Sequence, residues 1–308
     1  MPTDTRPDGD LDRLLDGLAC LRGQHKVATD LTGGLTNRNV RVTTADRDVV
    51  VRVSSKDSSL LAIDRTAECA NSLAAAECGA SPRVVEYAPQ DHLLVIEFIP
   101  GKTLTPQDVQ SEANLPRIAQ VCRQLHSGPR FVNDFDMFEV QRGYLRTVLE
   151  QGFRLPPGYR DHEPAVQAAR EALTTRDTAT VPCNNDLLAA NFIDDGTRLW
   201  IIDFEYSGNN DPCFELGNIA SESHLSPDQL AALVTHYYGR ELRHKIARAS
   251  LHAVMSNYGW SLWAAIQAAT SPLDFDFWSW GMEKYERAAA TFGSAEFTLL
   301  LAEAGRPD

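Results

Sequence analysis

The spacing of apolar residues is strand-like up to residue 99 and mostly helical beyond it. Runs rich in β-branched and aromatic residues predict strands at 39–44, 48–53, 83–87 and 93–98. The first two are separated only by residues 45–47, which predicts a hairpin. An Ala-rich segment with helical spacing, 64–79, lies between the two pairs of strands, with Asp64 able to cap its start and Gly79 able to end it. An apolar repeat over 11–21 predicts a short helix before the first strand.

Pro100 and Gly101 break this pattern, and we expect the boundary between two lobes there. After it, helical periodicity predicts helices at 107–125, 142–151, 163–174, 227–238, 242–269 and 281–292. The exception is a short β region over 181–204. The pattern therefore predicts an α+β chain, with a small β-rich lobe at 1–99 and a larger, mainly helical lobe at 100–308.

Composition agrees with two lobes and limits the partners. The chain has 308 residues, of which 43% are hydrophobic and 23% charged, and it exceeds a typical single domain of about 100–200 residues. Its net charge of −13 disfavours nucleic acid, because phosphate binding needs clustered Lys and Arg. The negative field of an acidic protein would suit a cationic ligand, although the more common reason for a negative net charge is that it keeps the protein soluble.

The cysteines and the first residues bear on the compartment. Six cysteines lie scattered, without a CxxC pair or zinc-like spacing, and we expect buried or inert thiols. The opening residues 1–15 lack a basic segment followed by an apolar one, and no apolar run approaches the ~18 residues of a membrane span. We expect a cytoplasmic protein with no membrane partner; the oligomeric state is open.

One segment carries most of the chemistry. Asp186 and Asn191 have the D-x-x-x-x-N spacing of a kinase catalytic loop, in which the Asp accepts a hydroxyl proton and the Asn holds metal. Asp203 ends the apolar strand L-W-I-I-D, where a second metal ligand is needed. The turn 194–196, D-D-G, lets the two flanking strands pair and bring Asp203 back to the loop. Asp and Asn also cap loops without any ligand, but the combination is more specific than either part.

These residues resemble a known family. C-x-N-D-L-L-x-x-N, followed by L-W-I-I-D-F-E-Y-S-G-N-N-D-P-x-F-E-L-G-N, is similar to the choline/ethanolamine kinases, which are relatives of the aminoglycoside phosphotransferases. The resemblance runs from Leu31 to about Ala290 and implies a bilobal protein-kinase-like fold, with ATP and Mg²⁺ as cofactors. Where the family usually has a His that supports the catalytic loop, this chain has Asn184, which puts the loop geometry in question.

On the nucleotide side, L-T-G-G-L-T-N resembles the phosphate-covering loop of the family. Adjacent glycines allow close backbone approach to phosphate, although Gly-Gly is also common in hairpins without a ligand. Arg52 interrupts the apolar strand V-V-V-R-V and is expected either to face solvent or to meet a partner. The resemblance implies that it binds ATP phosphates and Glu68, with Glu77 on the same helix as the alternative. The resulting nucleotide-binding set is Gly33, Gly34, Thr36, Asn37, Arg52, Glu68, Glu97 and Phe98.

On the acceptor side, four of the five tryptophans fall between residues 260 and 280. Trp260 and Trp263 are spaced i, i+3 and share one helix face. Aromatic faces and an acidic field are how proteins bind a quaternary ammonium, which cannot donate a hydrogen bond, although aromatic residues more often simply pack a core. By resemblance, the acceptor-binding set is Tyr206, Trp260, Trp263, Phe275 and Trp280, with Glu222 as a nearby carboxylate. Glu205 and Glu215 are expected to support the site, and His126 to be structural.

The resulting hypothesis is a small-molecule kinase. It transfers the ATP γ-phosphoryl group to the hydroxyl of choline or a close amino alcohol, with Asp186 as base and with Asn191 and Asp203 on Mg²⁺. Ethanolamine is an alternative acceptor, because its ammonium could use Glu222; an aminoglycoside would need several carboxylates and less aromatic surface. A third alternative, motivated by Asn184, is a protein that binds nucleotide or choline without turnover.

Overall fold

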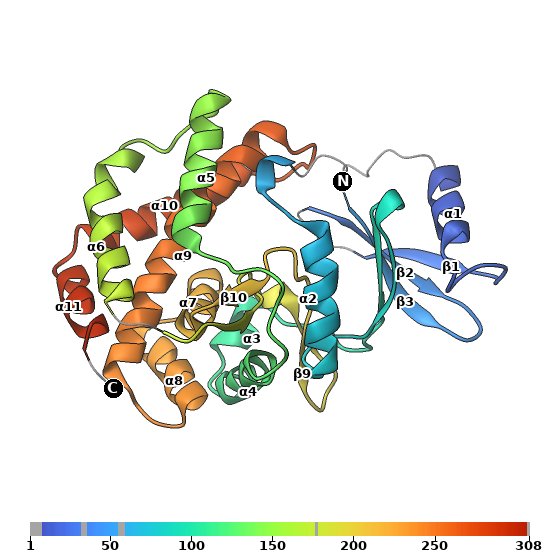
Figure 1. Ribbon diagram of the computed structural model, residues 1–308, viewed down its shortest axis with the longest axis horizontal. Helices are drawn as coiled ribbons and strands as arrows, with labels where there is room; N and C mark the ends of the chain where they lie inside the picture. The colour runs from blue at the N-terminus through green and yellow to red at the C-terminus, as the bar shows by residue number, and fades with distance from the viewer. Residues whose placement is uncertain (1–7, 32–35, 55–58, 176–177, 307–308) are drawn as a thin grey trace.

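The computed structural model describes residues 8–31, 36–54, 59–175 and 178–306. It has a small lobe built on an antiparallel sheet and a larger helical lobe, which lie side by side in Figure 1. The predicted α+β, bilobal kinase-like fold is confirmed. In Figure 1, α2 stands between the sheet and the helical lobe.

The sheet of the small lobe has the strand order β1-β2-β3-β5-β4. Its strands are β1 (Val27–Leu31), β2 (Arg38–Thr43), β3 (Asp48–Val53), β4 (Val84–Ala88) and β5 (Leu93–Glu97). Val49, Val51 and Val53 pack with helix α1 (Asp8–Gly17) in one hydrophobic core. Because side chains alternate along a strand, Arg52 projects from the opposite face, toward α2 (Arg65–Glu77).

The predicted hairpin and helix of this lobe are present, with small shifts. Strands β2 and β3 pair antiparallel, Arg38 with Val53 and Thr43 with Asp48. Helix α2 begins after Asp64, whose carboxylate accepts hydrogen bonds from two backbone N–H groups of the first turn. The expected helix over 11–21 begins and ends earlier, at 8–17, and strand β1 was not predicted.

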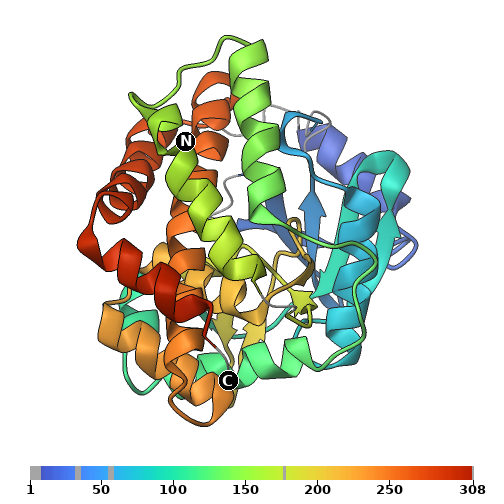
Figure 2. The same ribbon diagram turned by 60° about the vertical axis from the view of Figure 1, so that its left-hand side comes forward.

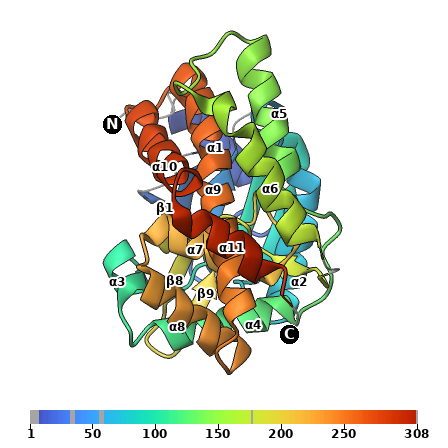
Figure 3. The ribbon, with the colours of Figure 1, turned by 90° about the vertical axis from the view of Figure 1, so that its left-hand side faces the viewer.

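The helical lobe is organised around one long helix. Its helices are α3 (Pro106–Gln110), α4 (Leu115–His126), α5 (Met137–Glu150), α6 (Glu163–Thr174), α7 (Pro212–Ser223), α8 (Pro227–Tyr238), α9 (Arg243–Thr270), α10 (Phe277–Phe292) and α11 (Ala295–Ala304). In Figure 2, α6 and α11 lie at the front, on the side of α9 away from the sheet. Figure 3 looks onto this lobe and shows α9 between α10 and α5. Within the described ranges, no helix combines the length and apolarity needed to cross a membrane.

The helices predicted for this lobe differ from the structure at two places. The single helix expected over 107–125 is two helices, since α3 ends before Ser111 and α4 begins at Leu115, with Pro116 in its first turn. Helix α7 was missed. Eleven of its twelve residues are buried, polar ones such as Glu215 and Asn218 among them, so the helix lacks the solvent-exposed polar face that marks a surface helix.

Short strands between the lobes carry the loops of interest. They are β6 (Lys102–Thr103), β7 (Val181–Cys183), β8 (Phe192–Asp194), β9 (Leu199–Ile201) and β10 (Gly208–Asn210). β8 and β9 form the predicted hairpin, β6 pairs with β8, and β7 pairs with β10. Gly196 has φ +89° at the hairpin turn, a conformation that favours glycine. All six cysteines are free thiols, four buried and two half-buried.

Helices α7 and α9 approach each other so closely at Gly217 that a side chain does not fit. A Cβ there would collide with the backbone oxygen of Ala249 and lie 2.8 Å from the backbone nitrogen of Ala253. We therefore expect Gly217→Ala to lower the free energy of unfolding by about 1–3 kcal/mol. Urea denaturation followed by circular dichroism measures the change.

Gly143→Ala is the matched control, since Gly143 lies inside α5 with open space around its Cα. Alanine is the better helix former, so this variant is expected to gain up to about 1 kcal/mol. Equal effects of the two substitutions would contradict the close approach of α7 and α9.

Candidate active site

A pocket with about 630 Å³ of empty space, part of it open to solvent, lies beside the short strands between the lobes. Its wall combines carboxylates, amide and hydroxyl groups with aromatic rings. The lining residues are Thr36, Asp186, Leu188, Ala190, Asn191, Asp203, Glu205, Tyr206, Trp260, Trp263 and Trp280. The structure thus brings the predicted catalytic residues and most of the predicted acceptor-binding residues to one place.

The loop after β7 presents Asp186 to the pocket. The side-chain amide of Asn191 donates a 2.7 Å hydrogen bond to the backbone oxygen of Asp186, which closes the loop on itself. With its N–H₂ used in this way, Asn191 keeps its amide oxygen for another partner. Asn185 has φ +68°, a turn conformation that Asn tolerates and that sets the direction in which Asp186 projects.

Side chains of helix α7 accept hydrogen bonds from the backbone of this loop. One carboxylate oxygen of Glu215 accepts the backbone N–H of Asn184 at 2.8 Å, and the other accepts that of Asn185 at 2.7 Å. Asn218, one turn further on, accepts the N–H of Leu187 at 2.6 Å. Three backbone N–H groups of the loop, those of Asn184, Asn185 and Leu187, therefore have acceptors on one buried helix.

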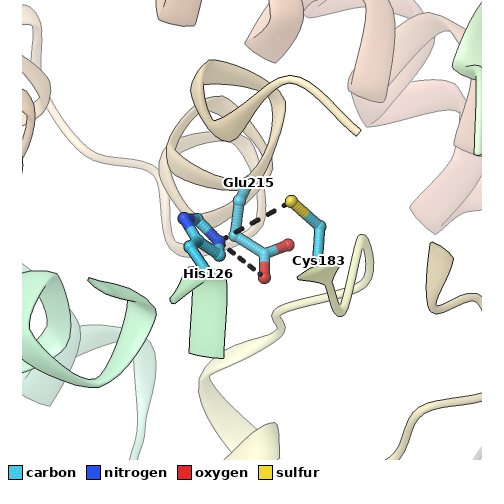
Figure 4. Close-up of side chains that lie close together, drawn as sticks. All are labelled: His126, Cys183 and Glu215. Carbon is cyan, nitrogen blue, oxygen red and sulfur yellow. Dashed lines mark hydrogen bonds and ion pairs between the residues drawn. The ribbon is translucent and has the colours of Figure 1, made fainter. Parts of the chain in front are cut away.

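His126 and Cys183 pack against the same carboxylate, as Figure 4 shows. The His126 Nε2 atom is 3.6 Å from both Glu215 Oε1 and Cys183 Sγ, and its Nδ1 is 2.8 Å from the Tyr237 hydroxyl. A Cys, a His and a Glu could ligate a metal ion in other settings. Here both oxygens of Glu215 already accept loop N–H groups, so the cluster supports the loop that carries Asp186, and His126 lies within that support.

Asn184 joins this loop to the loop that carries Asp203. Its side-chain N–H₂ donates to the backbone oxygens of Asp203 at 2.6 Å and of Ile202 at 3.3 Å, and its side-chain oxygen accepts the N–H of Asp186 at 3.1 Å. The amide thus makes two donor contacts to the loop of Asp203 and one acceptor contact to the loop of Asp186. Asn is therefore able to connect the two loops at the position where the family usually has His.

Asp203 stands at the end of the β8–β9 hairpin, as predicted. It has φ +62°, and the backbone N–H of the preceding Ile202 donates to the oxygen of Asn191 at 3.0 Å. Burial and the neighbouring Glu205 carboxylate raise the pKa of Asp203 to about 6, against the opposing effect of two nearby arginines. Asp203, Glu205 and Glu68 offer carboxylate oxygens within 4.8 Å of one another, and oxygen ligands of this kind suit Mg²⁺.

Two arginines neutralise these carboxylates. Arg52 contacts Glu68 through one guanidinium nitrogen and lies 2.8 Å from Asp203 through another. Arg65 lies 3.0 Å from Glu68 and also pairs with Glu205. Burial tends to raise the pKa of Glu205, but the charges of Arg52 and Arg65 outweigh burial and lower it. Arg65 was not predicted; its i, i+3 spacing to Glu68 on α2 was the available signal.

The remaining predicted nucleotide residues fall into three groups. Thr36 donates to Glu205 at 3.1 Å and Asn37 also bonds it, so both lie at the carboxylate cluster. Gly33 and Gly34 lie outside the described residues. The backbone N–H groups of Glu97 and Phe98 donate to strand neighbours within the sheet, and neither side chain lines the pocket.

Aromatic rings form the other part of the pocket wall. Tyr206 and Trp260 meet edge to face with centroids 4.8 Å apart, and the indole N–H of Trp263 donates to the Tyr206 hydroxyl at 2.7 Å. Trp280 packs edge to face on Trp263 at 5.8 Å. Phe275 is 42% exposed and lies 6.4 Å from Trp280, outside the pocket lining.

Glu222 lies behind these rings and is paired. Its two carboxylate oxygens are 2.6 and 2.7 Å from the ammonium of Lys284, which is also 4.4 Å from the centre of the Trp280 ring. Lys284 was not predicted, because a single Lys in a helical pattern is usually a solvated surface residue. Burial, followed by the charges of Glu222 and Asp203, raises the pKa of Asp186 well above its usual range, while Lys284 opposes the increase.

Comparisons with known proteins agree with this geometry. Residues 27–250 match the family model described as the phosphotransferase enzyme family. Protein LicA of Haemophilus influenzae is 27% identical over 257 residues, covering 79% of this chain and 74% of that protein. Ethanolamine kinase 1 of Mus musculus is 26% identical over 302 residues, covering 83% and 81%. The solved structure of a choline/ethanolamine kinase family protein from Mesorhizobium loti is 30% identical, with a TM-score of 0.85 and coverage of 96% and 98%.

Because Asn184 is fully buried and connects two loops, its loss leaves several backbone groups without partners. We expect Asn184→Ala to lower the free energy of unfolding by about 2–3 kcal/mol. Gln167→Ala removes an exposed amide bonded to Glu171 on α6 and is the control, with an expected change within about 0.5 kcal/mol. Chemical denaturation compares the two; equal stability would show that the Asn184 amide does not hold the loops.

Proposed function

The chain belongs to the phosphotransferase enzyme family, and we propose that it transfers the γ-phosphoryl group of ATP to the hydroxyl of choline or a close amino alcohol. One observation carries the proposal. A single pocket combines a set of oxygen-bearing side chains, Asp186, Asn191 and Asp203, with a set of aromatic rings. The first set suits a phosphoryl group and its metal ion, and the second suits an alkylammonium group.

Asp186 is the proposed base. Asp186 lines the pocket from a loop that hydrogen bonds hold in place. Its raised pKa gives the carboxylate a higher affinity for the hydroxyl proton. In this role it orients the acceptor hydroxyl and takes its proton as the new oxygen–phosphorus bond forms. Phosphoryl transfer needs little other covalent chemistry from the protein, so no covalent enzyme intermediate is required.

Mg²⁺ would supply charge neutralisation and orientation of the triphosphate when bound. The side-chain oxygens of Asn191 and Asp203 are the proposed ligands, since Asn191 has its N–H₂ directed to the Asp186 backbone and its oxygen available. Glu205 lies beside Asp203 and can bind the ion directly or through water. Arg52 is proposed to hold phosphate oxygens, with Glu68 keeping its guanidinium in place.

The acceptor's ammonium is proposed to lie against Tyr206, Trp260, Trp263 and Trp280. An amino alcohol has two carbons between oxygen and nitrogen, so a hydroxyl at Asp186 places the nitrogen a short distance away along the same pocket. Phe275, at the exposed rim, completes the aromatic part of the acceptor-binding set in this proposal, and Glu222, predicted as its nearby carboxylate, is paired with Lys284. Glu97 and Phe98, together with Gly33 and Gly34, complete the nucleotide set.

Ethanolamine is the second candidate acceptor, favoured by the relatives named as ethanolamine kinases. An aminoglycoside is disfavoured by the aromatic wall, because a polyamine sugar needs several carboxylates. A protein that binds without turnover would keep the pocket but release no ADP.

Replacement of the proposed base tests the mechanism. We expect Asp186→Asn to lower choline-dependent, Mg²⁺-dependent ADP release by about 10²–10⁴-fold, the range that a general base contributes. Asp46→Asn, in the exposed β2–β3 turn, is the matched control and is expected to turn over like the unaltered protein. Full turnover of Asp186→Asn would retire the assignment, and ATP binding without ADP release by the unaltered protein would favour the non-catalytic alternative.

Replacement of a ring tests the acceptor assignment separately from the chemistry. Trp263→Leu is expected to raise the KM for choline by about 2–30-fold, the range of one cation–π contact, and to leave the KM for ATP unchanged. Trp278→Leu is the control, because Trp278 lies on α10 beneath Arg154 and does not line the pocket. Steady-state kinetics with each substrate varied gives both constants; a rise confined to ATP would contradict the assignment.

A further inference from the structure

A buried ion pair lies directly behind the aromatic wall of the pocket. Glu222 is near the end of α7 and Lys284 is in the middle of α10, and the side chain of each is only 4% exposed. The two N–O distances, 2.6 and 2.7 Å, show that Lys284 holds both carboxylate oxygens. Buried charges persist only when they are paired in this way.

The Lys284 ammonium also contacts the pocket wall. It lies 4.4 Å from the centre of the Trp280 ring, and Trp280 in turn lines the pocket. The protein's own primary ammonium is thus bound as a substrate ammonium would be, by a carboxylate and an aromatic face. As a result, the Glu222 carboxylate behind the rings is already occupied.

Little hydrogen-bonding capacity is left among the rings for a second ammonium. The indole groups of Trp260, Trp263 and Trp280 can only donate, and the Tyr206 hydroxyl already accepts from Trp263. A primary ammonium has three N–H donors that lose their water partners in such a place. A quaternary ammonium has none and loses only weak hydration.

We propose that Lys284 determines acceptor specificity: by occupying Glu222 it withholds the carboxylate that a primary ammonium needs, so the pocket selects quaternary ammonium alcohols over primary ones. The inference rests on the proposed function and deepens it. Glu222 is linked to the pocket through Lys284, whose ammonium lies against the ring of Trp280.

The first test uses the unaltered protein. Ethanolamine and its mono-, di- and trimethylated forms differ only in how many N–H donors they carry. We expect kcat/KM to rise at each methylation, by about tenfold or more over the series, because each step removes a donor that finds no acceptor. A series that is flat or falls with methylation would overturn the inference, with no variant needed.

The second test frees the carboxylate. Lys284→Met keeps the length of the side chain and removes its charge, so we expect the ratio of kcat/KM for ethanolamine to that for choline to rise about tenfold. The double variant Glu222→Gln/Lys284→Met removes both charges, which buried sites often tolerate, and is expected to return the ratio toward its original value. Arg287→Met removes an exposed cation from the same helix and is expected to leave the ratio unchanged.

The possible outcomes distinguish a failure of this inference from a failure of the proposed function on which it rests. Turnover of choline with a ratio that Lys284→Met does not change overturns the role of Lys284 and leaves the proposed function standing. Turnover of none of the four alcohols overturns the proposed function, and this inference with it. If Lys284→Met fails to fold, a flat or falling methylation series still overturns the inference.

Discussion

Charged side chains from both lobes meet in one cluster, and the arrangement of the pocket depends on it. Arg52 from the sheet and Arg65 from α2 face three carboxylates, two of which, Asp203 and Glu205, belong to the helical lobe. These contacts tie the small lobe to the hairpin that ends at Asp203. Without the arginines, three neighbouring carboxylates would repel one another and the lobes would lose this polar connection.

A second constraint acts from within the helical lobe. Helix α7 accepts the loop backbone through Glu215 and Asn218, and at Gly217 it lies against α9, which carries Trp260 and Trp263. The same pair of helices therefore fixes both the proposed catalytic loop and part of the aromatic wall. A shift of α7 would displace the loop of Asp186 and the aromatic wall in the same direction, so the distance between these two sides of the pocket would be preserved.

The sequence allowed prediction of features that depend on local pattern. The hairpin of β2 and β3, the closeness of Asp186 and Asn191 expected from the D-x-x-x-x-N spacing, and the D-D-G hairpin all appear in the structure, because each is determined by neighbouring residues. Features that depend on distant partners were missed. Helix α7 is almost entirely buried and turns its polar residues toward the protein, and Lys284 is distinguished from a surface lysine by Glu222, which is far from it in sequence.

On the proposed function, the pairing of Arg52 with Asp203 couples the binding of the metal ion to the binding of the nucleotide phosphates. Asp203 would hold a metal ion through the carboxylate that now pairs with Arg52, and Arg52 would hold phosphate oxygens through the guanidinium that now pairs with Asp203. A metal ion alone would leave Arg52 paired with Glu68 but not with Asp203, and a phosphate alone would leave Asp203 without this guanidinium, whereas the two together would satisfy both side chains. On the proposed function, the preformed salt bridge would therefore act as heterotropic linkage, so that the pocket would favour the metal–nucleotide complex as a unit over either component by itself.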